Sequence, residues 1–324
     1  MKKYIVLLFI LALIIGSALA YFYFSPKPVT QTPPRPTPTP FAAERYSIPA
    51  LTTNPPEAGT LTVSGSVFEF RFQPDPGKKE IKKVTGVINF PQAGGPHPIV
   101  FLIRGFVDQE IYTTGMGSKK IGEYLSENGY ITIAPDFLGY ADSDSEAGNI
   151  FESRFQTYTT VLSLIASRNQ IPGFDGTNFF LWGHSNGGQI SLTTLAILGQ
   201  PIPTLLWAPV TKSFPYSILY YLDEAEDGGK FLRHELAKFE SVNNTDLFSF
   251  TNYLSQIKAP MMLLQGTTDD AVSVAWSQSF CKNAKNAEID IKCYYYAGAD
   301  HNLNPSWNEV AQRTLDFFNQ NLKN

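Results

Sequence analysis

Ser185 stands in the stretch "GHSNGG", between an apolar run that ends at Trp182 and a helical pattern that follows. The spacing Gly183-x-Ser185-x-Gly187, after a strand and before a helix, is typical of a nucleophile elbow that pushes a serine hydroxyl out of the backbone. Glycines are needed because side chains two positions from the serine would collide in so strained a turn. Glycine and serine also occur in ordinary loops, so the elbow needs support from the rest of the chain.

A serine becomes a good nucleophile when a histidine, held in place by a carboxylate, removes its proton. The chain has four histidines. His97 lies before the first core strand, His184 is adjacent to the serine with its side chain expected to point elsewhere, and His234 lies in an insertion. His301 follows the last strand-like run and precedes the last helical pattern. Because sites of this kind have the order serine, acid, histidine, we predict that His301 is the base.

The carboxylate should lie in a loop that follows a strand between the serine and the histidine. The stretch "MMLLQGTTDDAV" offers Asp269 and Asp270, and two adjacent side chains will not both point inward. We predict that Asp269 orients His301, whereas Asp270 faces solvent or caps the next helix. Asp300, which is adjacent to His301, is expected to be structural.

Acyl transfer also needs two backbone N–H groups aimed at the developing oxyanion, each contributing about 2.7 to 4 kcal/mol of transition-state stabilisation. We predict that Asn186, directly after the serine, supplies one N–H group. Phe106 in "FLIRGFVDQ" would supply the other, because Gly105 lets that backbone approach closely. Two cysteines and four scattered histidines are too few ligands for a metal site, so no metal and no organic cofactor is expected.

The elements that must position these residues alternate along the chain. Strand-like alternation at 67–72 and 84–90 predicts an antiparallel edge. Farther on, near-continuous apolar runs alternate with helical patterns, which predicts an α/β fold with a mostly parallel sheet covered on both faces. The strands are expected at 99–103, 130–134, 179–182, 204–208, 261–265 and 289–296, and the helices at 119–129, 151–167, 187–199, 275–286 and 306–322.

An insertion at 211–258 interrupts this alternation with two helix-like pieces, 216–225 and 230–240. Such an insertion usually lies over the carboxyl ends of the strands, where open sheets bind ligands. We interpret it as a lid, with a peripheral helical decoration as the alternative.

The N-terminus carries a different signal. Lys2 and Lys3 precede an uncharged run, residues 4–24, which as a helix would be roughly 31 Å long, close to the ~30 Å hydrocarbon core of a bilayer. We predict an anchor over residues 1–24; the alternative is a signal peptide cleaved near Ala18-Leu19-Ala20. In either case the lysines favour the cytoplasmic side, so the rest of the chain is expected to be extracytoplasmic, membrane-anchored or secreted.

A proline-rich stretch, residues 25–40, predicts an extended linker, and the folded domain is expected over 41–324. Export would permit a disulfide between Cys281 and Cys293, but two buried free thiols fit the sequence equally well. The net charge of −4 offers no basic surface for nucleic acid, which is therefore not an expected partner.

Residues 85 to 322 resemble the α/β-hydrolase superfamily. The motifs that carry the resemblance are "APDFLGYADSD", "GHSNGG", "IKAPMMLLQGTTDDAV" and "YYYAGADHNL", and the likeness is greatest to prolyl oligopeptidase catalytic domains and dienelactone-hydrolase-like enzymes. In the family pattern the first aspartate serves the histidine, which the resemblance places at Asp269. One departure is Arg104, which stands where most relatives have histidine before the glycine.

The resemblance implies a serine hydrolase that forms an acyl-enzyme and acts on an ester or amide. Fewer than about sixty residues separate the linker from the first core strand, so there is no room for the β-propeller of the large oligopeptidases. Small esters or short peptides are therefore the expected substrates, and nothing in the sequence separates esterase from peptidase. The alternative is a binding protein that keeps the fold without the reaction, although such proteins usually lose a member of the triad.

Overall fold

The structure is a computed structural model that describes residues 41–222 and 225–323. The predicted anchor at 1–24 and the linker at 25–40 lie outside the described residues. Within the described ranges, no helix combines the length and the apolar character that crossing a membrane requires.

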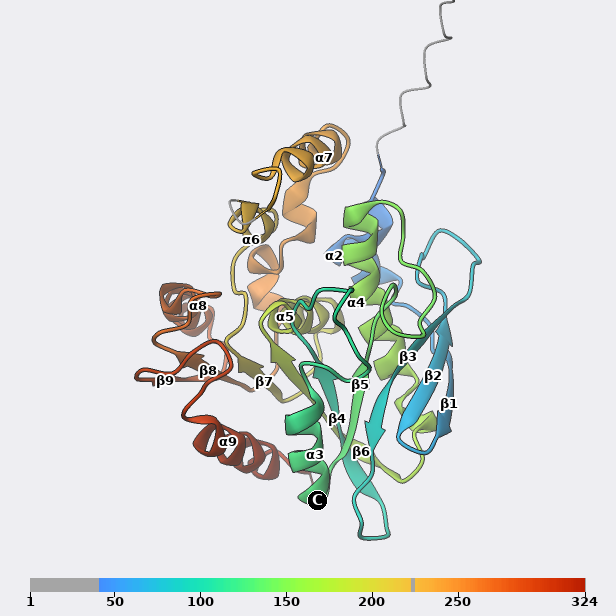
Figure 1. Cartoon of the computed structure of the whole chain (residues 1–324), viewed down its shortest axis with the longest axis vertical. Coiled ribbons are helices and arrows are strands. Elements are labelled where there is room, and N and C mark those ends of the chain that lie inside the picture. The colour runs from blue at the N-terminus through green and yellow to red at the C-terminus, as the bar shows by residue number, and fades with distance from the viewer. Residues whose placement is uncertain (1–40, 223–224, 324) are drawn as a thin grey trace, which may run out of the picture. The chain divides into compact units, whose positions relative to one another are not determined.

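A nine-stranded sheet runs through the described residues in the order β1-β2-β3-β5-β4-β6-β7-β8-β9 (Figure 1). Strands β1, β2, β3 and β5 pair antiparallel in turn, and every later neighbour is parallel, so the predicted antiparallel edge and mostly parallel sheet are confirmed. The strands are β1 (Thr60–Ser64), β2 (Val67–Phe72), β3 (Lys82–Asn89), β4 (His97–Ile103), β5 (Ile131–Pro135), β6 (Phe174–His184), β7 (Thr204–Trp207), β8 (Met261–Gly266) and β9 (Ile291–Tyr296).

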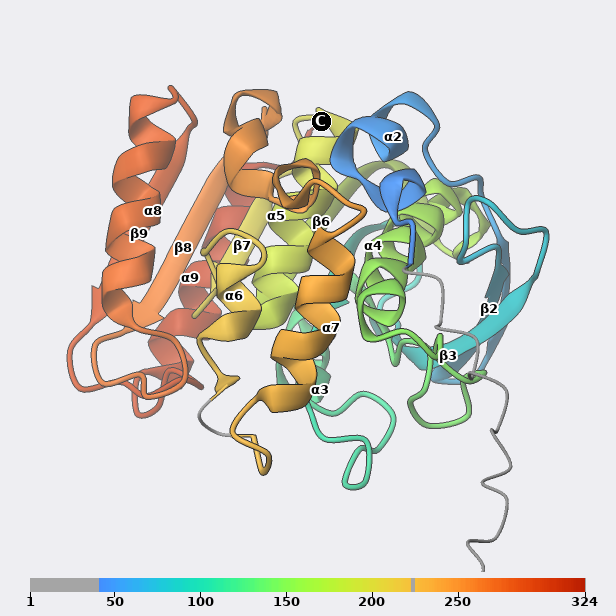
Figure 2. The same cartoon turned by 90° about the horizontal axis from the view of Figure 1, so that it is seen from above.

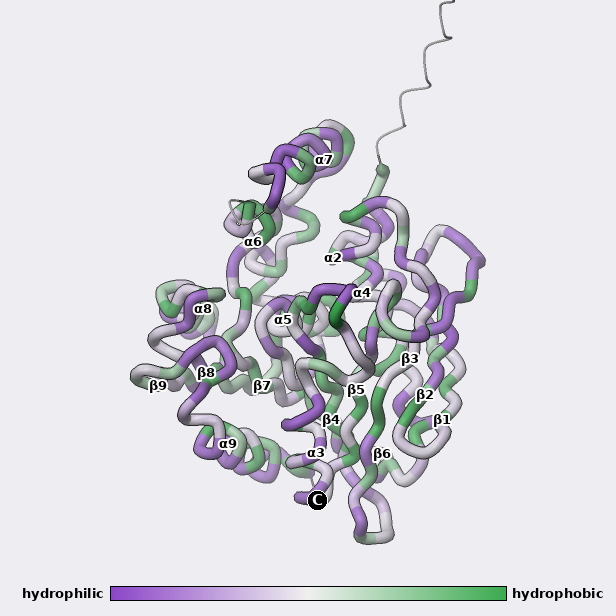
Figure 3. Tube along the Cα trace, viewed as in Figure 1, coloured by the Kyte–Doolittle hydropathy of each residue, from purple (hydrophilic) through white to green (hydrophobic). Residues whose placement is uncertain are grey.

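Helices cover both faces of the sheet (Figure 2). Because successive side chains of a strand point to opposite faces, Phe101 of β4 packs in one apolar core and Leu102 in the other. This is why the central strands β4, β5, β7 and β8 are almost entirely apolar, and the tube in Figure 3 has green stretches where it runs through the sheet. One core includes α2 (Ile48–Thr53), α4 (Ile150–Ala166), α5 (Asn186–Leu198) and α8 (Val274–Asn286), and the other includes α3 (Lys119–Glu127) and α9 (Trp307–Gln320).

The segment before β2 holds elements that the sequence did not predict: the 3₁₀ helix η1 (Glu44–Tyr46), α2 and β1. Helix α2 has only six residues, too few to show a helical pattern, and β1 alternates between exposed and half-buried residues without a fully buried one. Arg45 of η1 pairs with Asp75, which is also bound by Lys78, and so fastens this segment to the domain.

The insertion leaves the sheet at the end of β7 and contains α6 (Tyr216–Leu219), α7 (Lys230–Glu240), η4 (Thr245–Phe248) and η5 (Phe250–Gln256). Figure 1 shows α6 and α7 above the carboxyl ends of the parallel strands. Phe239 of α7 packs on Phe151 of α4, with ring centroids 4.8 Å apart. The Tyr221 hydroxyl donates to the carbonyl of Ala271, so the insertion also contacts the loop after β8.

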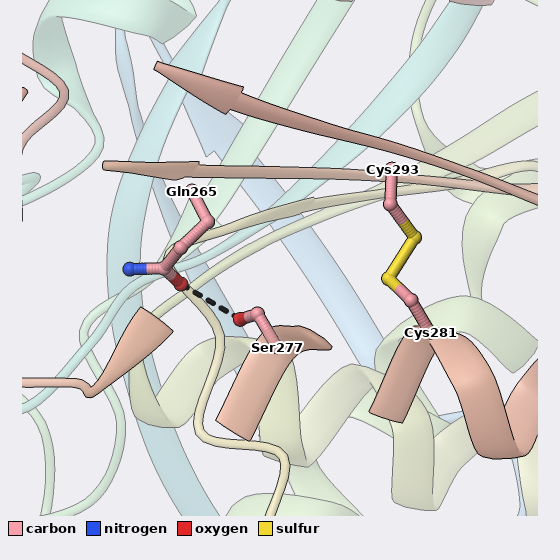
Figure 4. The surroundings of a disulfide bond; sticks show 4 residues. All are labelled: Gln265, Ser277, Cys281 and Cys293. Atoms are coloured by element: carbon pink, nitrogen blue, oxygen red, sulfur yellow. Dashed lines mark hydrogen bonds between the residues drawn. A yellow bond between two sulfur atoms is a disulfide. The ribbon is translucent and has the colours of Figure 1, made fainter. Parts of the chain in front are cut away.

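Cys281 of α8 and Cys293 of β9 form a disulfide, which settles the question that the sequence left open (Figure 4). One turn earlier in α8, the hydroxyl of Ser277 donates to Oε1 of Gln265 over 2.8 Å. Helix α8 is therefore fixed to both β8 and β9, the strands that precede Asp269 and His301.

Candidate active site

Ser185 occupies a strained turn between β6 and α5, with a φ of +55°. A Cβ on Gly187 would lie 1.9 Å from the carbonyl oxygen of Ile103, and a Cβ on Gly183 would lie 2.5 Å from the hydroxyl of Ser191. Both glycines are therefore required for the strand, the serine and the helix to pack this closely. The backbone N–H of Ser185 donates to Trp207 over 3.0 Å, which ties the turn to β7.

His301 and Asp269 are paired at the carboxyl ends of the neighbouring strands. Nδ1 of His301 lies 3.0 Å and 2.9 Å from the two carboxylate oxygens of Asp269, whose side chain is fully buried. A carboxylate accepts hydrogen bonds, so Nδ1 carries the proton that it donates and Nε2 is left as a proton acceptor. The structure thus brings together the predicted acid and base.

The Asp269 carboxylate is kept ionised by its surroundings. Burial alone would raise its pKa, but the hydrogen bonds from His301 and from the N–H of Val272 outweigh burial and hold the pKa below its ordinary value. Gln265 and the N–H of Ala271 also donate to the carboxylate. An ionised Asp269 stabilises a proton on the His301 ring.

The loops that carry these two residues are joined directly. A Cβ on Gly266 would lie 2.2 Å from the carbonyl oxygen of Ala299, and the N–H of Thr268 donates to the same carbonyl over 3.0 Å. Asp300 accepts from the N–H groups of Asn302 and Asn304, which gives it the structural place expected of it. Asp270 is exposed.

His184 corrects one expectation, because its side chain does not point away from the site. Its ring packs on the ring of His301 with centroids 4.7 Å apart, and its Nε2 donates to the carbonyl of His301 over 3.1 Å. Burial, with the neighbouring imidazole of His301 as the second cause, lowers the pKa of His184 to about 4, so its ring is neutral near pH 7. Sequence spacing could not reveal this contact because it depends on how the loop after β9 folds back.

The loop after β4 lies against the serine from the other side. A Cβ on Gly105 would lie 2.8 Å from Cβ of Ser185 and 3.4 Å from its hydroxyl oxygen. In the described chain, the backbone N–H groups of Phe106 and Asn186 donate to no protein acceptor. The Phe106 side chain is 78% exposed, so packing of its ring does not explain the conformation of this loop.

Arg104 explains that conformation instead. Its side chain is buried, and its two terminal NH₂ groups donate to the carbonyls of Gly105 and Asp136. The guanidinium also lies 4.1 Å from the ring centroid of Tyr140 and 4.4 Å from that of Tyr112. Arg104 therefore shapes the Gly105–Phe106 turn from beneath.

A pocket of about 220 Å³ opens beside this turn, and we call it the α4 pocket. Sequence reasoning missed it, because its polar lining residues come from separate segments, and those of the helical pattern at 151–167 gave no sign that they line a pocket. Its lining comprises Arg104, Gly105, Phe106, Phe137, Leu138, Tyr140, Glu146, Ile150, Ser153, Arg154, Gln156, Thr157, Thr160, Asn186 and Ile190. Among the described residues, no three His, Cys, Asp or Glu side chains are grouped to bind a metal ion.

Comparison with protein families identifies relatives over most of the domain. The model of the prolyl oligopeptidase family matches residues 119–324. The uncharacterized peptidase YtmA of Bacillus subtilis is 22% identical over 243 residues, which cover 74% of this chain and 89% of that protein. A monoglyceride lipase homolog of monkeypox virus is 25% identical over 231 residues, which cover 60% of this chain and 80% of the viral protein.

Solved structures with similar folds include esterases and peptidases. Est1E of Butyrivibrio proteoclasticus, solved with ferulic acid, has a TM-score of 0.53 at 18% identity and covers 74% of this chain and 95% of its own. A putative dipeptidyl aminopeptidase IV of Bacteroides ovatus has a TM-score of 0.56 at 15% identity, covering 79% and 36%. The α/β hydrolase GrgF of Penicillium has a TM-score of 0.54 at 17% identity, covering 78% and 98%. The predicted α/β-hydrolase fold is confirmed.

Proposed function

The chain belongs to the prolyl oligopeptidase family and is a serine hydrolase, and we propose that it cleaves small esters or short peptides through Ser185, His301 and Asp269. The observation that carries the proposal is the His301–Asp269 pair, in which Nδ1 of His301 lies 2.9 Å from a carboxylate oxygen, and it is supported by the contact of the His301 ring with His184, the residue before Ser185. This pair leaves Nε2 of His301 as the proton acceptor that a serine needs.

In the proposed reaction, the Ser185 oxygen bonds to the substrate carbonyl carbon while its proton passes to Nε2 of His301. The charge that develops on the carbonyl oxygen is met by the N–H groups of Phe106 and Asn186, which have no acceptor in the described chain. The carbon–leaving-group bond then breaks, and the leaving group takes the proton from His301. Water then attacks the acyl carbon while Nε2 takes its proton, the bond from that carbon to the Ser185 oxygen breaks, and His301 returns the proton to the serine as the acid leaves.

The neutral ring of His184 supports this role for His301. A cationic neighbour 4.7 Å away would oppose protonation of the base during catalysis, whereas a neutral imidazole does not. Its hydrogen bond to the His301 carbonyl also holds the loop in place. We therefore assign His184 as a positioning residue.

Two observations favour small substrates. The described domain begins at residue 41 and its first strand at Thr60, so no propeller precedes the sheet within it. The α4 pocket, at about 220 Å³, would accept a short chain or one small side chain. Turnover of short 4-nitrophenyl esters, compared with that of aminoacyl and dipeptidyl 4-nitroanilides, decides between esterase and peptidase.

A fluorophosphonate probe tests the triad directly. We expect it to label the wild-type chain and to lose the label in Ser185→Ala, because labelling requires an activated serine hydroxyl at that position. A folded wild-type chain that takes no label would contradict the proposal.

We also propose that residues 4–24 anchor the chain in the membrane, with the catalytic domain on the extracytoplasmic side. The apolar run and the disulfide, which persists in oxidising compartments, favour this location. Fractionation and N-terminal sequencing of the mature chain test it. A chain in the membrane fraction that retains residues 1–24 supports the anchor, whereas a soluble exported chain that starts near Tyr21 supports a cleaved signal peptide.

A further inference from the structure

The α4 pocket begins at the atoms that the proposed reaction uses. Phe106 and Asn186, whose N–H groups would receive the oxyanion, are among its lining residues, and a Cβ on Gly105, which also lines it, would lie 3.4 Å from the Ser185 hydroxyl oxygen. Arg154 of α4 also lines the pocket. A group of the substrate held in this pocket would therefore be joined to the reacting carbonyl by only a short chain.

Arg154 has no carboxylate partner among the described residues. Its terminal NH₂ group donates to Oε1 of Gln189, which is neutral, and its charge takes part in none of the ion pairs of the described chain. The pocket's one carboxylate, Glu146, is exposed and accepts from Ser153 and Gln109. Among the residues that the structure describes, no anion therefore compensates the positive charge of Arg154.

Three residues that line the pocket each carry a buried polar atom with no partner in the described chain. Nε of Arg154, Nε of Arg104 and Oε1 of Gln156 are buried without a hydrogen-bond partner in the described chain, and the side chains of Arg104 and Gln156 are each 4% exposed. Buried donors and acceptors are nearly always paired in folded proteins, so three unpaired atoms around one pocket indicate a site for a polar ligand.

Gln189 fixes the position of the Arg154 side chain, to which such a ligand could bind. Its side chain is 2% exposed, and its amide nitrogen donates to the carbonyl of Lys212 and to the hydroxyl of Ser217. Both acceptors belong to the start of the insertion, so Gln189 ties Arg154 of α4 to that segment. A guanidinium fixed in this way loses little side-chain freedom when it binds an anion.

We propose that the substrate carries a carboxylate, which pairs with Arg154 when the reacting carbonyl is at Ser185. This inference rests on the proposed function and names its substrate class. A guanidinium presents its N–H donors in a plane that matches the two oxygens of a carboxylate. The apolar lining residues Leu138, Ile150 and Ile190 would contact the short carbon chain between the ester and the carboxylate.

Two matched pairs of esters test this proposal in the full-length chain. 4-Nitrophenyl hydrogen adipate carries its carboxylate on the acyl side, and its methyl ester is the neutral match. 3-(Butyryloxy)benzoic acid carries the carboxylate on the leaving group, and its neutral match is methyl 3-(butyryloxy)benzoate. In at least one pair we expect kcat/KM to be about ten to a hundred times higher for the acid, the range of one charge-assisted pair in a partly buried site.

Variants assign that preference to one side chain. Arg154→Gln should reduce the ratio of kcat/KM between acid and neutral ester to near one, and Arg154→Lys should keep part of it because the charge remains. Arg71→Gln is the matched control, since it removes the same charge from exposed β2 and should leave the ratio unchanged. Melting temperature and fluorophosphonate labelling of each variant show that it is folded.

The outcomes separate this inference from the proposed function. If Ser185→Ala leaves the turnover of these esters intact, the proposed function is wrong. If the wild-type chain turns over both members of each pair equally well and Ser185 is required, only the carboxylate preference is wrong. A preference that survives in Arg154→Gln would also overturn the inference, because it would place recognition of the carboxylate elsewhere.

Discussion

The two sides of Ser185 differ in how their polar atoms are satisfied. On the His301 side, Asp269 accepts hydrogen bonds from the imidazole, from two backbone N–H groups and from Gln265, and His184 supports the loop. On the Arg154 side, buried donors and an acceptor have no partner within residues 41–222 and 225–323, and the backbone N–H groups of Phe106 and Asn186 have none there either.

This difference matches the work that each side would do. A base must be held in one orientation and one tautomer before the substrate arrives, so its hydrogen bonds are completed within the protein. A surface that binds the substrate must keep its hydrogen-bonding groups available for the ligand. Its donors are therefore held in position but are not paired with protein acceptors. The comparison can be tested by perturbing each side separately.

A substitution on the His301 side, where the hydrogen bonds are completed within the protein, should have the largest effect on kcat. Asp269→Asn removes the anion that holds His301 and stabilises its protonated ring, so kcat should fall by about 10⁴ while the fold is kept. Assays of the hydrolysis of a short 4-nitrophenyl ester measure the loss of kcat, and circular dichroism checks that the variant is folded. Asp270→Asn is the matched control, because that side chain is exposed, and it should remain active. Equal losses in the two variants would mean that the wrong aspartate has been assigned.

The Arg154 side can be tested by removing a single backbone N–H group. Phe106→Pro deletes the backbone donor, and we expect kcat to fall by about 10² to 10³, the effect of losing one oxyanion donor. Phe106→Ala removes the exposed ring and keeps the N–H, so it should retain most of the activity. If alanine and proline reduce kcat alike, the ring and not the backbone contributes at this position.

Much of the architecture was predictable because its signal is local. Continuous apolar runs bounded by glycine or proline placed the parallel strands, and β2 begins and ends at the predicted residues 67–72. The region before β2 was predicted less well: α2 is a six-residue helix that packs on the distant helix α5, and η1 is held by the Arg45–Asp75 ion pair. Helices this short owe their structure to tertiary contacts and are too short to show a periodic pattern, whereas β1 pairs with the adjacent β2 and alternates like a strand, a local signal that was overlooked.

The site divides in the same way. Ser185, Asp269 and His301 each follow a strand of the parallel part of the sheet, and the carboxyl ends of parallel strands meet at one edge. Sequence order therefore sufficed to predict Asp269 as the partner of His301, and the two are hydrogen-bonded in the structure. Arg154 and His184 could not be found like this, because their importance depends on what they face across the pocket or the loop. A charged residue on a helix is usually solvated, and only the structure reveals that Arg154 lines a pocket.

The disulfide offers a further test of the His301 side, because it joins α8 to β9, the strand that precedes His301. Cys281→Ala with Cys293→Ala opens a loop with a sequence separation of 12 residues, and the free energy of unfolding should fall by about 3 kcal/mol. Urea unfolding of oxidised wild type and variant measures this loss. Because Ser277 still bonds Gln265, we expect kcat/KM to change less than threefold. A collapse of kcat/KM with stability intact would mean that the disulfide positions His301 and does not merely stabilise the fold.

The smallest expected effect concerns His184, the one titrating group of the completed side that is held neutral by burial. Its pKa in the folded chain is about 4, below the ~6.5 of an unfolded chain, so between these values the unfolded state binds more protons. Stability therefore falls as the pH drops from about 6.5 to about 4, by roughly 1 to 3 kcal/mol for this group. His184→Gln keeps a donor for the His301 carbonyl and cannot titrate, so its free energy of unfolding should change less over that window.

Urea unfolding at pH 6.5, 5.5 and 4.5 gives the two slopes. The carboxylates of Asp75 and Asp269, whose pKa values are lowered, lose their contribution only as the pH falls below the ordinary range near 4, so the window isolates His184. His234→Gln is the matched control, since that side chain is exposed on α7 and should leave the slope as in wild type. Parallel slopes for wild type and His184→Gln would show that the His184 ring accepts a proton without loss of stability, and that the completed side tolerates a second positive charge beside His301.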